Sequence, residues 1–212
     1  EWKEANVLPI PKKGNIHEIS NYRPISLPSL VSKLLEQVVN IHVSEFVQSS
    51  LNNLQHGFGF RKRGSCITQL LGVFHDVGKA LDSRKESDMI YLDFSKAIQC
   101  HIACNLLLKL EQHGVSGLLL SWFSDYLNER RQRVVVEGVA SSFLTATSGV
   151  SQGSVLGPLL FLTYANDLPN AANHSIVSMF ADDSKCYREI SQPRDRDFLQ
   201  LDLNLLHQWS ST

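Results

Sequence analysis

The sequence has few cysteines, no long apolar run and no visible signal peptide. Its four cysteines among 212 residues include no Cys-x-x-Cys pair, which argues against a disulfide scaffold or a zinc finger and indicates a reducing compartment. The longest apolar stretch, at 156–165, is too short and too interrupted to cross a bilayer. We therefore expect an intracellular protein of the nucleus or cytoplasm, without a membrane partner.

The chain also lacks an excess of either charge. A net charge of −1 and a pI near 6.8 exclude a strongly basic nucleic-acid-binding surface over the whole chain. Basic residues instead gather locally, at Lys12–Lys13, at Arg61–Lys62–Arg63 and at Arg130–Arg131. There are no internal repeats and no Gly/Ser/Pro linker, so one continuous structural unit is the simplest organisation. Motif-like text begins at Glu1, which favours a segment of a longer protein.

Apolar periodicity predicts a chain of mixed helices and strands. Helical spacing is found at 30–47, 67–81, 103–113, 117–129, 157–168 and 196–209. Extended segments are expected at 5–14, 88–94, 131–139 and 141–150, with a hairpin over 175–190. The strands should be largely antiparallel because a hairpin cannot be parallel. The predicted fold class is α+β, with helices behind one sheet.

Carboxylates lie at the ends of two predicted strands. Asp93 is near the end of the buried-looking strand 88–94, and Asp182–Asp183 lie at the tip of the hairpin. An Asp-Asp-Ser string alone is typical of a tight turn. If the two elements were neighbours in one sheet, however, three carboxylates would meet where unpaired charge is costly. Hard divalent cations prefer such ligands, so the pattern predicts a two-magnesium site for nucleotidyl transfer.

Three strings around these acids occur in a specific order. They are IYLDFSKA at 90–97, SGVSQGSVLGPLLF at 148–161 and FADD at 180–183. This set resembles motifs A, B and C of the reverse transcriptase domain of non-LTR (LINE-like) retrotransposons. The segments 21–27, 55–66 and 199–209 resemble flanking parts of the same family. The resemblance covers nearly the whole chain, and the ordered set is far more specific than a lone Asp-Asp pair.

The resemblance implies a fold and an activity. The implied fold is that of polymerase fingers and palm, with an antiparallel palm sheet backed by helices and with the thumb absent. Residues 1–85 would form the fingers and the fingers–palm helices, and residues 86–212 the palm with its closing helix. The implied activity is that of an RNA-directed DNA polymerase that extends a primer 3′-OH. Its partners would be an RNA template, a DNA primer and dNTPs.

The resemblance also implies roles for particular residues. Asp93, Asp182 and Asp183 would be catalytic and would hold two Mg²⁺ ions, with Mn²⁺ as an alternative and the backbone carbonyl of Phe94 as a further ligand. The residues implied to bind the nucleotide are Arg23 and Lys33 at the triphosphate, Gln152 and Gly153 beside the base, and Ile98 beneath the sugar. The residues implied to lie along the template are Arg61, Lys62 and Arg63.

The chain departs from the family pattern at several positions. Ile98 and Gln99 replace an aromatic residue and an acid, and Ser151 replaces a proline. A smaller side chain at position 98 predicts weaker exclusion of ribonucleotides. Two alternatives to an active polymerase therefore stay open. One is a degenerate, non-catalytic remnant that at most binds nucleic acid, and the other is an unrelated α+β domain whose acids serve turns or calcium.

Overall fold

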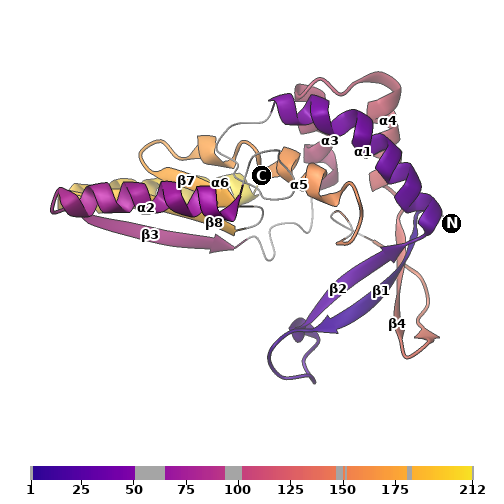
Figure 1. The fold of residues 1–212 in the computed structure, drawn as a ribbon. Helices are drawn as coiled ribbons and strands as arrows, with labels where there is room; N and C mark the ends of the chain where they lie inside the picture. The colour runs from indigo at the N-terminus through magenta and orange to yellow at the C-terminus, as the bar shows by residue number, and fades with distance from the viewer. Residues whose placement is uncertain are drawn as a thin grey trace. The chain divides into compact units, whose positions relative to one another are not determined.

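The computed structural model describes residues 2–50, 65–93, 102–146, 150, 152–180 and 183–211. The chain forms two compact units, each made of two separate segments (Figure 1). The first unit comprises Glu1–Ser49 and Gln99–Phe161, and the second comprises Ser50–Ile98 and Leu162–Thr212. This division differs from the segments 1–85 and 86–212, so their assignment to fingers and palm stays a prediction.

A small mixed sheet forms one part of the first unit. Its strands are β1 (Glu4–Pro11), β2 (Tyr22–Pro28, preceded by the 3₁₀ turn η1, Ile19–Asn21), β4 (Arg131–Val136), β5 (Val139–Ala140) and β6 (Leu144–Thr145). The strand order is β2-β1-β4-β5, with β6 also paired to β4. The β1–β4 pair is parallel, an exception to the antiparallel arrangement expected from the sequence. Strand β2 was not predicted because it contains Pro24 and Pro28, and it lies at the sheet edge, where proline is tolerated.

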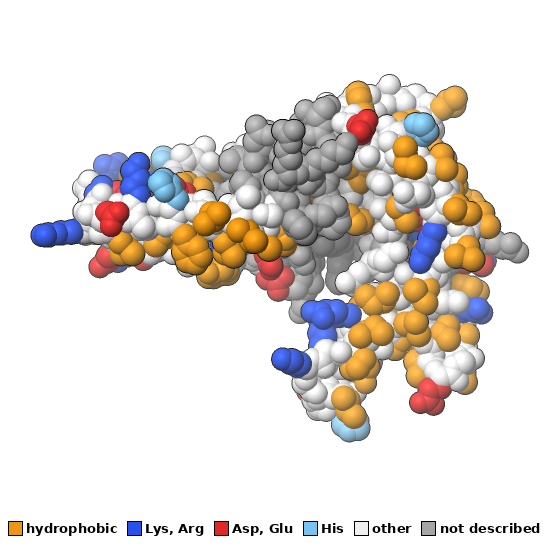
Figure 2. Space-filling view, in the orientation of Figure 1, with side chains coloured by type: hydrophobic (Ala, Val, Ile, Leu, Met, Phe, Trp, Pro, Cys, Tyr) orange, Lys and Arg blue, Asp and Glu red, His pale blue; other side chains and the backbone are white. Residues whose placement is uncertain are grey.

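Three helices complete the first unit: α1 (Leu30–Ser50), α3 (Ile102–Gln112) and α4 (Gly117–Leu127). All three agree with the apolar periodicity, and α3 ends two residues before Gly114, which has a positive φ of 88°. The buried face of α1 is unexpected, because it carries Ser32 and Glu36 together with Val43 and Val47. Most of the apolar residues that predicted α1 are exposed: Leu30, Val31, Leu34, Val38, Ile41 and Phe46. Figure 2 shows orange, hydrophobic side chains at the surface along this helix.

The second unit is a three-stranded antiparallel sheet between two helices. Its strands are β3 (Glu86–Asp93), β7 (Ile176–Phe180) and β8 (Asp183–Ile190), in the order β3-β8-β7. Helix α2 (Cys66–Asp82) contacts one face, where Tyr187 donates to Asp76 (2.7 Å). Helix α6 (Pro193–Ser211) contacts the other, where Arg188 donates to Asp195 (2.8 Å). Neighbouring strand residues point to opposite faces, so helices cover both sides of this sheet (Figure 1).

Strand β3 is more exposed than the sequence predicted. The string 88–94 looked like a buried strand, but β3 is an edge strand and its side chains are half-buried or exposed. Tyr91, for example, is 73% exposed. The remaining helix, α5 (Gly157–Ala165), spans the point at which the chain passes from the first unit to the second, and the 3₁₀ turn η2 (Leu168–Ala171) follows it.

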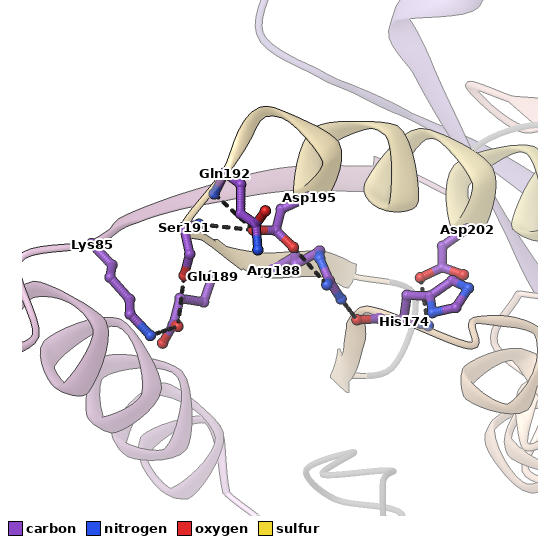
Figure 3. Close-up of polar contacts among 8 residues, drawn as sticks. All are labelled: Lys85, His174, Arg188, Glu189, Ser191, Gln192, Asp195 and Asp202. Carbon is purple, nitrogen blue, oxygen red and sulfur yellow. Dashed lines mark hydrogen bonds and ion pairs between the residues drawn. The ribbon is translucent and has the colours of Figure 1, made fainter.

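A polar network fastens α6 to the sheet (Figure 3). Asp195, in the first turn of α6, accepts hydrogen bonds from the amides of Ser191 (2.9 Å) and Gln192 (3.0 Å). Arg188 of β8 donates to Asp195 and also to the backbone oxygen of His174. Further along α6, Asp202 is fully buried and accepts the amides of Asn173 (2.8 Å) and His174 (2.9 Å). The network therefore joins α6, β8 and the segment before β7.

These contacts lower the pKa of both carboxyl groups. The hydrogen bond from Arg188, together with the amides of Ser191 and Gln192, lowers the pKa of Asp195 to about 2. Burial by itself would raise the pKa of Asp202, but the hydrogen bonds that it accepts outweigh burial and hold its pKa below the ordinary value. Both side chains therefore stabilise the folded chain in their ionised form.

Replacing Asp195 by Asn should produce a pH-dependent loss of stability. The folded-state pKa of about 2 lies below the unfolded-state value of about 3.9, so the stabilisation is complete above roughly pH 4. It is lost as the pH falls through about 2. Urea unfolding between pH 2 and pH 7 should give wild type a higher free energy of unfolding than Asp195→Asn at neutral pH, and this difference should shrink as the pH falls. The exposed Asp197→Asn is the control. A difference that is equal at pH 2 and pH 7 would contradict the stabilising role of the ionised Asp195.

Candidate active site

The antiparallel pairing of β3 with β8 brings two of the predicted catalytic acids together. Asp93 is the last residue of β3, Asp183 is the first residue of β8, and the two are directly opposite in the ladder. Both side chains are exposed. Directly opposite residues point to the same face of a sheet, with Cβ atoms about 4.5–5.5 Å apart. The two carboxylates therefore share one end and one face of the sheet.

Two like charges in this position repel each other, which destabilises a cross-strand pair. A cation between them would remove the repulsion, and hard divalent ions prefer carboxylate oxygens. Among the residues that the structure describes, no group of three or more His, Cys, Asp and Glu side chains could hold a metal ion. The third predicted acid, Asp182, lies outside those residues, as does Phe94. The described part of the site therefore offers two carboxylates, which are the type of ligand that hard divalent ions prefer.

The nearest cation on β8 is engaged by neighbouring side chains. Lys185, two residues after Asp183, donates to the side-chain oxygen of Gln69 on α2 (3.3 Å). Its ammonium group also lies 5.9 Å from the centre of the Tyr91 ring. Gln69 in turn donates to Ser178 of β7 (3.2 Å), so the lysine belongs to a layer of contacts between α2 and the sheet.

A pocket of about 230 Å³ lies beside Asp93 and was not predicted from the sequence. Its lining comes from the end of β3, from η2 and from the C-terminal part of α6: Leu92, Asp93, Leu168, Leu203, Leu206, His207, Trp209 and Ser210. Trp209 donates its indole N–H to Asp167 (3.2 Å) and packs against Tyr164 with ring centroids 5.4 Å apart. The sequence indicates this pocket only through two ring side chains, His207 and Trp209, near the end of the amphipathic helix α6.

The predicted nucleotide-facing segment lies in the first unit and contacts β2. The backbone oxygen of Gln152 accepts a hydrogen bond from the amide of Ser26 (2.8 Å). Gly153 has a φ of 112°, which side chains rarely adopt, and an added Cβ would lie 2.5 Å from the backbone oxygen of Ser26. Position 153 therefore requires glycine for both its dihedral angle and its close approach to β2, while its place beside the base stays a prediction.

The two predicted triphosphate contacts also belong to the first unit. Arg23 is exposed on β2, opposite Ile10, and Lys33 is half-buried in the first turn of α1. The remaining predicted residues lie outside the described part of the chain: Arg61, Lys62, Arg63, Ile98, Phe94 and Asp182. Their roles stay predictions.

A buried acid next to the Gln152–Gly153 segment was missed by the sequence analysis. Glu36 of α1 is 1% exposed and accepts hydrogen bonds from the amides of Val155 (2.6 Å) and Leu156 (3.3 Å). The position of Glu36 on the helix could have indicated its burial, because Ser32, Glu36, Val43 and Val47 recur on one face. The more numerous apolar residues elsewhere on the same helix suggested a different buried face.

Comparison with known proteins supports the motif assignment. Residues 10–211 match the family model of the reverse transcriptase (RNA-dependent DNA polymerase). The chain is 32% identical over 191 residues to a probable RNA-directed DNA polymerase from transposon X-element of Drosophila melanogaster, covering 86% of this chain and 21% of that one. It is 28% identical over 193 residues to the RNA-directed DNA polymerase from mobile element jockey of Drosophila melanogaster, with the same coverage. The chain thus spans about a fifth of the length of these curated relatives.

A solved structure shows the same fold. Apo telomerase from Candida tropicalis, truncated from its C-terminal domain, superposes with a TM-score of 0.63 at 14% identity, covering 99% of this chain and 48% of that one. The likeness confirms the α+β, polymerase-type fold that the motifs implied. Within the described ranges, no helix has the length and apolar character needed to cross a membrane. The chain belongs to the reverse transcriptase family, as a reverse transcriptase domain of the non-LTR retrotransposon type.

Proposed function

We propose that this chain contains the polymerase centre of a reverse transcriptase, which adds a deoxynucleotide to the 3′-OH of a DNA primer opposite an RNA template. The observation that carries the proposal is the register pair Asp93–Asp183, with two carboxylates at one end of one sheet. A domain that only binds nucleic acid has no need to place like charges opposite each other. The site would act in the nucleus or cytoplasm, where RNA and dNTPs are present.

The metal ligands would be Asp93, Asp183, Asp182 and the backbone carbonyl of Phe94, for two Mg²⁺ or two Mn²⁺ ions. The described pair fits this role because carboxylate oxygens are the ligands that hard cations prefer. When bound, such ions supply charge stabilisation for the attacking oxygen and for the departing pyrophosphate. The chain itself contributes the rigid placement of the carboxylates, since both belong to paired strands rather than to a loop.

The nucleotide would be held by a further set of residues. Arg23 and Lys33 supply positive charge for the triphosphate, and such contacts neutralise phosphate oxygens without reading sequence. Gln152 and Gly153 present backbone to the base pair that is being formed. In the part of the chain that is not described, Ile98 would lie beneath the sugar and Arg61, Lys62 and Arg63 along the template.

Replacing Asp93 or Asp183 by Asn should abolish primer extension. Loss of a cation ligand removes several kcal/mol of transition-state stabilisation, which is about a thousandfold or more in rate. Extension of an oligo(dT) primer on poly(rA), with Mg²⁺ and separately with Mn²⁺, measures the effect.

The control for this experiment is Asp88→Asn. Asp88 is a carboxylate of the same strand that pairs with Arg196 (3.0 Å) instead of facing another acid. We expect it to retain activity within about threefold, as is usual for an exposed ion pair. Equal losses in Asp88→Asn and Asp93→Asn would contradict the proposed role. A wild-type chain that binds primer–template but never extends it would favour the non-catalytic remnant.

Replacing Gly153 by Ala should impair nucleotide use more than it impairs folding. The new methyl group would meet the backbone oxygen of Ser26, so the Gln152–Gly153 segment must shift. We expect the KM for dTTP to rise about tenfold, because a displaced backbone costs one to a few kcal/mol of nucleotide binding. Gly138→Ala is a matched control, since Gly138 also has a positive φ (82°) but nothing within 4 Å of an added Cβ. An equal rise in KM for both variants would refute the role of position 153.

A further inference from the structure

The segment that leads from Gln152 into α5 is fastened to its unit at two places. The first is β2, through the amide of Ser26 and the close approach of Gly153. The second is the side chain of Glu36, which reaches from α1 to the amides of Val155 and Leu156. The first of these amides lies two residues after Gly153, which is proposed to face the nucleotide. Glu36 is therefore placed to control where this segment lies.

The carboxylate of Glu36 is held in one orientation. The hydroxyl of Ser32, one helical turn earlier, donates to Oε1 (3.2 Å), while Oε2 accepts both amides. The side chain is 1% exposed, so these contacts occur away from water, where hydrogen bonds to a charged group are strongest. Every contact is specific to one oxygen, and the carboxylate is left little freedom to turn.

The location of the two amides explains why an acid is suitable here. Val155 and Leu156 precede α5, whose first residue, Gly157, donates its amide to the hydroxyl of Ser154 (3.0 Å). The amides at the start of a helix have no partners within the helix, and a negative charge there is favoured by the helix dipole. Glu36 thus supplies acceptors that the segment itself lacks.

The surroundings of Glu36 also include Tyr126 of α4. Burial, and after it the charge of Glu36, raises the pKa of the Tyr126 phenol far above its ordinary value, although the guanidinium of Arg130 acts in the opposite direction. The phenol consequently stays neutral at any working pH, so Glu36 has no competing negative charge on this side.

An apolar residue would be less costly to bury than a carboxylate if packing were the only requirement. We propose that Glu36 is a positioning residue, which fixes the segment 152–156 for the incoming nucleotide. This inference rests on the proposed function, because it assigns Glu36 to the nucleotide step of that same site. It goes beyond the predicted nucleotide contacts, since Glu36 acts through the backbone of Val155 and Leu156.

The test uses three variants of the full chain. Glu36→Leu removes both acceptors at similar volume. Glu36→Gln keeps them in part, because its amide oxygen can face Val155 and Leu156 while its NH₂ group donates to the hydroxyl of Ser32. Val43→Ala is the control for general destabilisation, since Val43 is buried on the same face of α1 (3% exposed) and takes no part in these contacts.

Two measurements are made on each variant: hydrogen exchange at the amides of Val155 and Leu156, and steady-state dTTP use on poly(rA)/oligo(dT). In Glu36→Leu we expect these two amides to lose protection and the KM for dTTP to rise about tenfold, as for the loss of a charge-assisted hydrogen bond. Glu36→Gln should recover most of both effects. Val43→Ala should lower the melting temperature and leave the two amides and the KM as in wild type.

These measurements separate a positioning role of Glu36 from a contribution to the stability of the fold alone. Unchanged exchange at both amides in Glu36→Leu would overturn the inference, and so would an equal rise in KM in Val43→Ala. If even the wild-type chain shows no extension, hydrogen exchange decides alone. Selective loss of protection at these amides in Glu36→Leu then supports the conclusion that Glu36 holds the segment 152–156 in place. The missing activity counts against the proposed function only.

Discussion

The proposed chemistry depends on the register between β3 and β8. A shift of one residue would send Asp93 and Asp183 to opposite faces of the sheet, because successive side chains alternate. The ladder between the two strands runs without interruption from Glu86–Ile190 to Asp93–Asp183. Lys85, directly before β3, also donates to Glu189 of β8. A one-residue slip of β3 along β8 would disturb this ion pair and move the side chains of β3 to the other face relative to those of β8.

Buried or partly buried carboxylates accept hydrogen bonds from pairs of backbone amides at three places in the chain. Glu36 accepts the amides of Val155 and Leu156, Asp195 those of Ser191 and Gln192, and Asp202 those of Asn173 and His174. In each case the two amides are consecutive and come shortly before α5, α6 or β7. A charged acceptor provides strong hydrogen bonds to amides that regular structure leaves without partners. The same device therefore positions the start of an element in both units.

The sequence predicted the helices and strands better than it predicted their contacts with distant parts of the chain. Apolar periodicity located α1, α2 and α6 closely, and the motif order paired the strand ending in Asp93 with the hairpin that contains Asp183. Strand β2 was hidden by its prolines, since local rules cannot tell an edge strand from a loop. The inward position of Glu36 was also hidden, because it depends on amides more than a hundred residues away in the chain. Contacts between distant segments leave little trace in local patterns.

The stability conferred by Mg²⁺ tests the central claim, that Asp93 and Asp183 face each other and share a divalent ion. The measurement is the free energy of unfolding of wild type and Asp93→Asn, each in EDTA and in MgCl₂. In EDTA the variant should be at least as stable as wild type, because it lacks the repulsion between opposite carboxylates. Added Mg²⁺ should stabilise wild type in proportion to ion binding by the folded state, and should do so much less in the variant. Equal stabilisation of both proteins by Mg²⁺, or none in wild type, would contradict the claim.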